Sequence, residues 1–303
     1  MPGPDSSKGE KNFHVDVPMK TDGFFLRGSN ALDWGMKNRL SRIFNPKSGR
    51  TVMLAFDHGY LMGPTSGLER MDLGIVPLMP YVDCLMCTRG ALRACIPPET
   101  EKPVCLRVSA GATVLKDDMT DECIGVDVDD AIRLNAAAMA VQCYVGGVHE
   151  RQTLDNLSRV INAGNRYGIP TLGVTAVGKE MVRDARYLGM ASRVLAELGA
   201  HYIKTYFCAE KFEEVVAGCP VPIVIAGGKK IPERDAIEMA HQAISQGALG
   251  VDMGRNIFCA EDPVAMVRAV QAVVHEDLNP AKAYEMYQDL KGAKSGRKSG
   301  KKG

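Results

Sequence analysis

The hydrophobic positions of this chain repeat a pattern in which a short β-rich run precedes an amphipathic helical segment. Eight runs are rich in β-branched and small apolar residues, as buried parallel strands are. They are Thr51–Asp57, Val82–Thr88, Val104–Ser109, Ala138–Val145, Thr171–Ala176, Tyr202–Phe207, Ile223–Ala226 and Gly250–Gly254. Eight such units, spaced by roughly 20 to 35 residues, predict an α/β fold of the (β/α)8 TIM-barrel type in one catalytic domain over residues 31–280.

Between these runs lie segments whose apolar residues recur three or four positions apart, which predicts helices. They are Asp129–Ala140, Arg151–Tyr167, Asp184–Leu198, Glu210–Ala217, Glu233–Gln246 and Asp262–His275. Glycines that can end a helix follow four of them, at Gly168, Gly199, Gly218 and Gly247.

An extra helix is predicted before the first strand, over Leu32–Phe44. Its apolar residues form one stripe, which indicates packing against the barrel or against a neighbouring subunit. Residues 1–30 precede it as an N-terminal extension. Residues 281–303 follow the barrel as the end of a helix and a tail.

The composition is that of a soluble globular protein, with 46% hydrophobic and 24% charged residues. The chain shows no apolar stretch of membrane-spanning length and no basic-then-apolar signal at its start, which predicts a cytoplasmic protein. Nine cysteines in apolar segments suit reduced thiols rather than disulfides. Cys84 and Cys87 have CxxC spacing, but no second pair follows, so no metal site is expected.

The formal charge of +1 conceals an asymmetry between body and tail. Residues 291–303 carry six basic and no acidic residues, so the remainder has a net charge of −5. Interleaved glycines and serines predict that this tail is disordered. It could contact a polyanion such as RNA, but it lacks aromatic residues for base stacking, which favours a solvated extension without a catalytic role.

Candidate chemistry begins with Lys204, which lies inside the apolar run from Tyr202 to Phe207. An isolated ammonium group is costly to bury, so the pKa of Lys204 is expected to fall and its neutral amine to become a nucleophile, as in a Schiff-base enzyme. The alternative is a lysine at a strand end whose amino group reaches water.

Barrel enzymes place their chemistry at the C-terminal ends of strands, and those ends are polar here. They carry Asp57 and His58 after the first strand, Arg107 on the third and Tyr144 on the fourth. If Lys204 points inward, Asp57 and Tyr144 can point at the same cavity.

The loops after the seventh and eighth strands contain glycines next to cations. Gly227 and Gly228 precede Lys229 and Lys230, and Gly254 precedes Arg255. Glycines let backbone N–H groups approach an anion, and these two loops often bind phosphate in this fold. A phosphorylated substrate is therefore expected.

Several longer motifs resemble the class I aldolase family of the archaeal fructose-bisphosphate aldolase type, from about Leu32 to about His275. They are Leu32-Asp33-Trp34-Gly35-Met36, Arg42-Ile43-Phe44-Asn45-Pro46-Lys47-Ser48-Gly49-Arg50, Ala55-Phe56-Asp57-His58-Gly59, Met86-Cys87-Thr88-Arg89-Gly90, Gly164-Asn165-Arg166-Tyr167-Gly168-Ile169-Pro170, Ile203-Lys204-Thr205-Tyr206, Ile225-Ala226-Gly227-Gly228-Lys229-Lys230 and Gly250-Val251-Asp252-Met253-Gly254-Arg255-Asn256-Ile257-Phe258.

The resemblance implies roles for individual residues. It implies a Schiff base on Lys204, an acid/base pair of Asp57 and Tyr144, and no bound cofactor. It also implies phosphate binding by four residues of the glycine loops: Gly227, Gly228, Gly254 and Arg255. A homo-oligomer, often a decamer of two pentamers, follows from the same resemblance.

The branch of the family that the motifs resemble most acts in autoinducer-2 degradation. This implies acetyl transfer from 3-hydroxy-5-phosphonooxypentane-2,4-dione to coenzyme A, giving acetyl-CoA and dihydroxyacetone phosphate. Aldolases of the family tend to carry an aromatic residue where this chain has Gln142, which weakens a sugar-aldolase interpretation. His58 either donates to substrate oxygens or caps its loop. Cys87 and Cys143 lie on predicted strands, where buried thiols are usually inert.

Two other functions remain open. One is a class I sugar-phosphate aldolase of the fructose-bisphosphate type, with the same lysine and phosphate site. The other is an inactive barrel that acts as a polyanion-binding or scaffold protein through its basic tail, which the intact set of Lys204, Asp57 and Tyr144 argues against.

Overall fold

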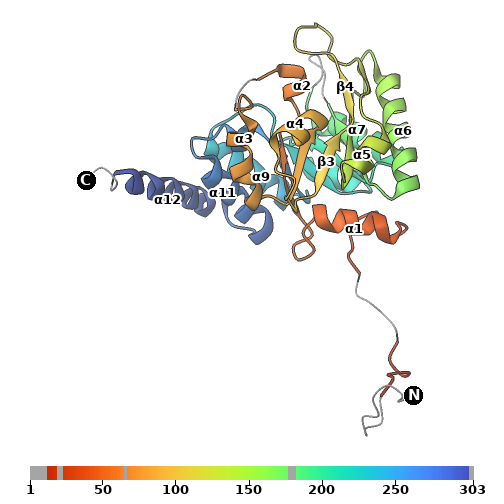
Figure 1. The fold of residues 1–303 in the computed structure, drawn as a ribbon, viewed down its shortest axis with the longest axis horizontal. Coiled ribbons are helices and arrows are strands. Elements are labelled where there is room, and N and C mark those ends of the chain that lie inside the picture. The colour runs from red at the N-terminus through yellow and green to blue at the C-terminus, as the bar shows by residue number, and fades with distance from the viewer. Residues whose placement is uncertain (1–11, 19–22, 65–66, 177–181, 300–303) are drawn as a thin grey trace, which may run out of the picture.

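The computed structural model describes residues 12–18, 23–64, 67–176 and 182–299. Eight parallel strands form a closed barrel in the order β1-β10-β9-β8-β7-β6-β3-β2 (Figure 1). These strands are β1 (Thr51–Ala55), β2 (Cys84–Thr88), β3 (Val104–Arg107), β6 (Ala138–Cys143), β7 (Thr171–Thr175), β8 (Tyr202–Tyr206), β9 (Ile223–Ala226) and β10 (Gly250–Met253). Each predicted run contains one strand, so the predicted TIM barrel is confirmed.

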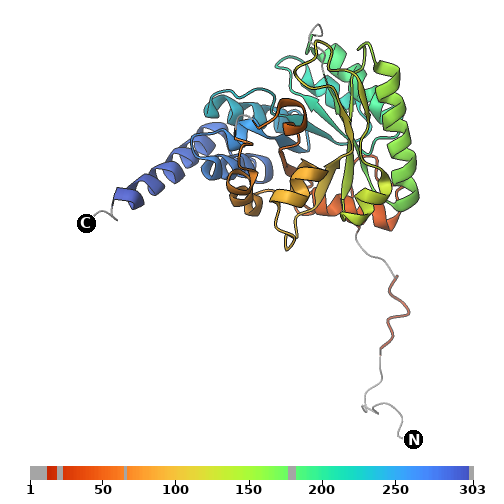
Figure 2. The same ribbon diagram turned by 45° about the horizontal axis from the view of Figure 1, so that its top comes forward.

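Helices surround the barrel and connect its strands (Figure 2). The longer ones are α1 (Trp34–Ile43), α6 (Glu150–Tyr167), α7 (Ala185–Glu197), α9 (Glu233–Ser245), α11 (Pro263–Glu276) and α12 (Pro280–Ser299). The shorter ones are α2 (Gly59–Met62), α3 (Met71–Gly74), the 3-10 helix η1 (Val76–Tyr81), α4 (Arg89–Cys95), α5 (Val128–Arg133), α8 (Phe212–Gly218) and α10 (Arg255–Phe258). None of the described helices combines the length and apolar character needed to cross a bilayer.

The helix predicted over Asp129–Ala140 was wrong in its extent, because α5 ends at Arg133. Asn135 adopts a left-handed conformation with φ 54°, which ends the helical path. Ala138 then begins β6 and pairs with Cys105 of β3. The residues from Ala138 onward therefore pair as a strand, although the spacing of their apolar side chains was also compatible with a helix.

Helix α1 closes the end of the barrel where the strands begin. Met36, Leu40 and Ile43 are buried on it in the same cluster as Met53 of β1. The ring of Phe44 meets that of Tyr202 edge-on, with centroids 5.5 Å apart. The expected packing of this helix against the barrel is confirmed.

A two-stranded antiparallel hairpin follows β3 and was not predicted. It consists of β4 (Ser109–Gly111) and β5 (Glu122–Ile124). Its strands approach closely at Gly111, where an added Cβ would lie 2.1 Å from the carbonyl oxygen of Asp121. The hairpin stands beside the strand ends at the top of Figure 1, near α2.

The C-terminal helix is longer than expected. Helix α12 packs its first turns on α9 and α11, burying Ala283 and Tyr287, and then leads away from the barrel (Figures 1 and 2). The helix extends to Ser299, and the disorder expected of the tail from residue 291 stays a prediction. Residues 300–303 lie outside the described part.

Candidate active site

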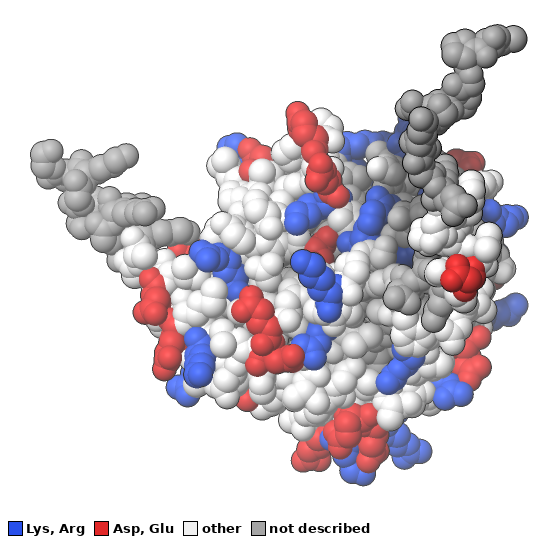
Figure 3. All heavy atoms as spheres, turned by 90° about the horizontal axis from the view of Figure 1, so that it is seen from below, with Lys and Arg blue, Asp and Glu red and all other residues white. Residues whose placement is uncertain are grey.

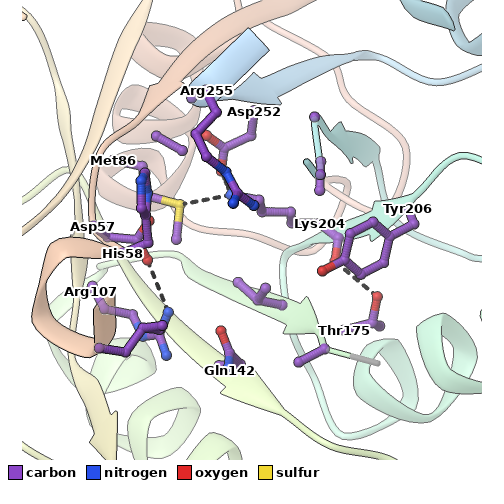
Figure 4. A pocket seen from close by; sticks show the side chains of 18 residues that line it. Asp57, His58, Met86, Arg107, Gln142, Thr175, Lys204, Tyr206, Asp252 and Arg255 are labelled. Atoms are coloured by element: carbon purple, nitrogen blue, oxygen red, sulfur yellow. Dashed lines mark hydrogen bonds and ion pairs between the residues drawn. The ribbon is translucent and has the colours of Figure 1, made fainter. Parts of the chain in front are cut away.

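A cavity of about 150 Å³ opens at the C-terminal ends of the barrel strands. Figure 4 shows side chains from several strands converging on it. Of the eight residues assigned a catalytic or phosphate-binding role from the sequence, all but Tyr144 line it: Asp57, His58, Lys204, Gly227, Gly228, Gly254 and Arg255. Arg107, Gln142, Tyr206 and Asp252 line it as well.

Lys204 reaches this cavity from the middle of β8. Its side chain points inward, because it shares the inner face of the strand with the buried Tyr202. The hydroxyl of Thr175 on β7 donates to the Lys204 carbonyl oxygen at 3.1 Å. Lys204 is 8% exposed, so the alternative of a lysine reaching out to water is excluded.

The expectation that the pKa of Lys204 would fall was wrong. Burial by itself lowers this pKa, but the carboxylates of Asp252 and Asp57 outweigh it and the pKa of Lys204 is raised. The Lys204 Nζ lies 2.9 Å from Asp252 Oδ2 and 3.5 Å from the sulfur of Met86. The lysine is therefore a paired ammonium group and not the isolated one assumed from sequence.

Asp252 is the functional candidate that sequence reasoning missed. Its side chain is fully buried, and burial raises its pKa while Lys204 opposes that rise. The signal was present in the sequence, since Asp252 is an acidic residue inside the apolar β10. Its partner Lys204, however, lies on β8, two strands away across β9, and no local pattern reveals that contact.

Asp57 and His58 both face the cavity, although adjacent strand residues point to opposite faces. This is possible because β1 ends at Ala55, before either residue. Burial alone raises the pKa of Asp57, but the positive charges of Arg107 and Lys204 bring it below its usual value.

The ring of His58 stacks on Phe258 and makes no capping hydrogen bond to α2, contrary to the loop-capping alternative. Burial lowers the pKa of His58, so the ring is neutral.

Tyr144 follows β6 but does not line the cavity. Gln142 occupies that wall, and its amide Nε2 donates to the Tyr144 hydroxyl. Burial raises the pKa of Tyr144 to about 12, so the phenol is protonated. Tyr144 was expected to point into the cavity. Instead, its hydroxyl contacts Gln142, and Gln142 lines the cavity wall.

The two glycine loops lie side by side and are joined by Asn256. This fully buried side chain donates to the carbonyl oxygens of Gly227 at 2.6 Å and Lys229 at 3.2 Å, and accepts from the backbone N–H of Ile231 at 2.9 Å. Gly254 lies against β1, where a Cβ would be 2.2 Å from the Ala55 carbonyl oxygen. Among the described residues, none forms a hydrogen bond or salt bridge with the Arg255 guanidinium. This cation at the cavity wall is therefore available to bind an anion.

Other candidate groups are less reactive. Burial raises the pKa of the Cys87 and Cys143 thiols, so neither is a thiolate. All nine cysteines are free thiols. In the described ranges, no group of three or more histidine, cysteine and acidic side chains is placed to hold a metal ion.

Comparison with known proteins identifies relatives of this chain. The model of the DeoC/LacD family of aldolases matches residues 51–260. "Uncharacterized aldolase PM1278" of Pasteurella multocida is 58% identical over 95% of this chain and 99% of its own length. The 3-hydroxy-5-phosphonooxypentane-2,4-dione thiolase of Photorhabdus laumondii is 57% identical over 93% of this chain and 97% of its own length.

Among solved structures, an archaeal fructose 1,6-bisphosphate aldolase superimposes with a TM-score of 0.73 at 24% identity, covering 80% of this chain and 99% of that one.

Proposed function

Because the chain belongs to the DeoC/LacD family of aldolases, we propose that it transfers the acetyl group of 3-hydroxy-5-phosphonooxypentane-2,4-dione to coenzyme A. The products are acetyl-CoA and dihydroxyacetone phosphate. The observation that carries this proposal is the burial of Lys204 beside Asp252, in one cavity with both glycine loops. The relatives named as this thiolase are the second support.

The first step is imine formation on Lys204. The ammonium group passes a proton to Asp252, whose pKa is raised by burial and whose carboxylate lies 2.9 Å away. The neutral Nζ then adds to C4 of the dione, and loss of water leaves an iminium ion. The Asp252 carboxylate thus accepts the proton and leaves a neutral amine, which burial alone does not produce.

The second step is cleavage of the C2–C3 bond. The thiol of coenzyme A loses its proton and its sulfur adds to the C2 carbonyl carbon. When the C2–C3 bond breaks, its electron pair moves into the iminium and forms an enamine, while C2 leaves as the acetyl thioester. Protonation of C3 and hydrolysis of the imine release dihydroxyacetone phosphate and restore Lys204.

Two groups are proposed to move protons in these steps. Asp57 is ionised beside the cavity and serves as the base. Tyr144 is protonated and is proposed as the acid, and the Gln142 amide holds its ring in place by donating to the hydroxyl oxygen. Neutral His58 is proposed to orient substrate oxygens.

The phosphate of the dione is proposed to bind the glycine loops. Gly227, Gly228 and Gly254 let the backbone approach it, and Arg255 contributes a positive charge. Because the phosphate lies on C5, one bond from the carbon that forms the imine, both sites must belong to one small cavity, as they do here.

Aldol cleavage of a ketose bisphosphate is the second candidate, since the family is one of aldolases and the same imine would serve it. Dependence on coenzyme A distinguishes the two reactions. The purified protein should convert the phosphorylated dione to acetyl-CoA and dihydroxyacetone phosphate only when coenzyme A is present, as followed by mass spectrometry. Cleavage of fructose 1,6-bisphosphate without any thiolysis of the dione would establish the aldolase instead.

A further inference from the structure

Arg107, at the end of β3, makes a contact with Asp57 to which the proposed reaction assigns no role. Its side chain is 3% exposed, and its Nη1 donates to Asp57 Oδ2 at 2.9 Å. Figure 4 shows this pair at one wall of the cavity, across from Lys204. A guanidinium ion buried in this way fixes both the charge and the direction of the carboxylate that it contacts.

The remaining donors of Arg107 are held by other groups. Its Nη2 donates to Glu122 Oε1 at 2.7 Å and to the Tyr60 hydroxyl at 2.8 Å. Its Nε donates to the Ser109 carbonyl oxygen at 2.8 Å. With three sides of the planar group occupied, the orientation of the Nη1 that meets Asp57 is fixed.

Glu122 is itself held firmly, although it comes from the β4–β5 hairpin. Its side chain is 1% exposed and accepts hydrogen bonds from Ser109 Oγ at 2.6 Å and from the Tyr60 hydroxyl at 2.8 Å. Its backbone carbonyl oxygen accepts from Asn156 of α6 at 2.8 Å. The hairpin therefore connects α6 to the guanidinium that contacts Asp57.

The charges around Asp57 show what Arg107 adds. The ionisable groups that face Asp57 are His58, Tyr60, Cys87, Cys105, Arg107, Lys204 and Asp252. Only Arg107 and Lys204 among them are cations, and Lys204 loses its charge when it forms a carbinolamine. Arg107 is thus the cation that stays beside Asp57 while the lysine reacts.

We propose that Arg107 is a positioning residue that keeps Asp57 ionised and directed into the cavity, and that Glu122 of the hairpin holds Arg107 for this task. The inference rests on the proposed base role of Asp57, and it applies equally to thiolysis and to aldol cleavage.

The test is the pH dependence of kcat/KM for the cleavage reaction that the wild-type protein catalyses. In Arg107→Met, burial is no longer opposed by the guanidinium, so the pKa of Asp57 rises. We expect a new acid inflection between about pH 5 and 8, and a loss of about 10²-fold at neutral pH through misorientation. The double variant Arg107→Met with Asp57→Asn lacks the Asp57 carboxyl and should lose this inflection, whereas an inflection that persists in it would come from Glu122, which also loses the guanidinium.

Two further variants separate charge from geometry. Arg107→Lys restores the positive charge without the planar fork, so the inflection should disappear while kcat stays below the wild-type value. Glu122→Gln keeps an acceptor of the same shape and leaves Asp57 paired, so it should lower kcat without an acid inflection. If Arg107→Met does not fold, these two variants still decide the matter, since wild-type kcat in both would overturn the proposal.

A loss in Arg107→Met that is equal at every pH would overturn the proposal too, because a merely structural role predicts that result. The assay requires only that the wild-type protein cleaves one of the two substrates. A wild-type protein active on neither would mean that the proposed function has failed, which is a separate outcome.

Discussion

At the scale of single residues, the pairing of Lys204 with Asp252 determines how the amine becomes reactive. The two side chains are buried together, with Nζ and Oδ2 2.9 Å apart. In the proposed mechanism, the free amine is therefore produced by proton transfer within the pair and not by a low pKa. Loss of either partner would leave an uncompensated buried charge, which typically costs about 3–5 kcal/mol of stability.

Replacing Asp252 should change the pH at which Lys204 reacts. Asp252 is the main group that raises the pKa of Lys204, so in Asp252→Asn this pKa falls. An amine with a lower pKa is neutral at lower pH, and the midpoint of imine formation should move downward. The midpoint can be measured as the rate of cyanoborohydride trapping with dihydroxyacetone phosphate against pH, with thermal unfolding as the control for folding.

A midpoint that stays constant or moves to higher pH in this variant would mean that Asp252 does not control the pKa of the amine.

Local sequence patterns explain why only part of this pair was predicted. The apolar run around Lys204 predicted its burial, and the polar strand ends predicted Asp57. Asp252 lies on β10, and its contact with Lys204 of β8 depends on the arrangement of these strands on either side of β9.

At the scale of elements, the loops after β9 and β10 act as one unit because Asn256 joins them. The cluster of glycines and cations predicted this region, since those residues lie close together in sequence. Asn256 was missed as a joining group because its partners Gly227 and Lys229 belong to the other loop. The β4–β5 hairpin was missed for a different reason, because three-residue strands carry too few alternating positions to be recognised.

The proposed phosphate site predicts a selective effect of Arg255→Ala. A charge-assisted hydrogen bond to phosphate is worth about 1.5–3 kcal/mol, so kcat/KM for the phosphorylated dione should fall by roughly 10- to 100-fold. The unphosphorylated dione makes no such contact, and its turnover should change little. Steady-state kinetics on both substrates tests this. Equal losses on both would indicate that Arg255 supports the fold or the catalytic groups instead.

At the scale of the whole molecule, the eight apolar runs predicted the barrel. Each run is short, and the segments between runs have the apolar spacing of helices. The face in Figure 3 shows basic and acidic side chains interspersed over the barrel. Contact of the basic tail with a polyanion stays a prediction. Assembly into a decamer of two pentamers stays a prediction.

The proposed mechanism depends most on Lys204 as the residue that forms the imine. Incubation of the intact protein with the phosphorylated dione or dihydroxyacetone phosphate, followed by borohydride, should leave one substrate-derived adduct, and peptide mass spectrometry should place it on Lys204. Lys204→Arg keeps the positive charge but cannot form this imine, so it should carry no adduct. An adduct on Lys229 or Lys230, with Lys204 unmodified, would contradict the account.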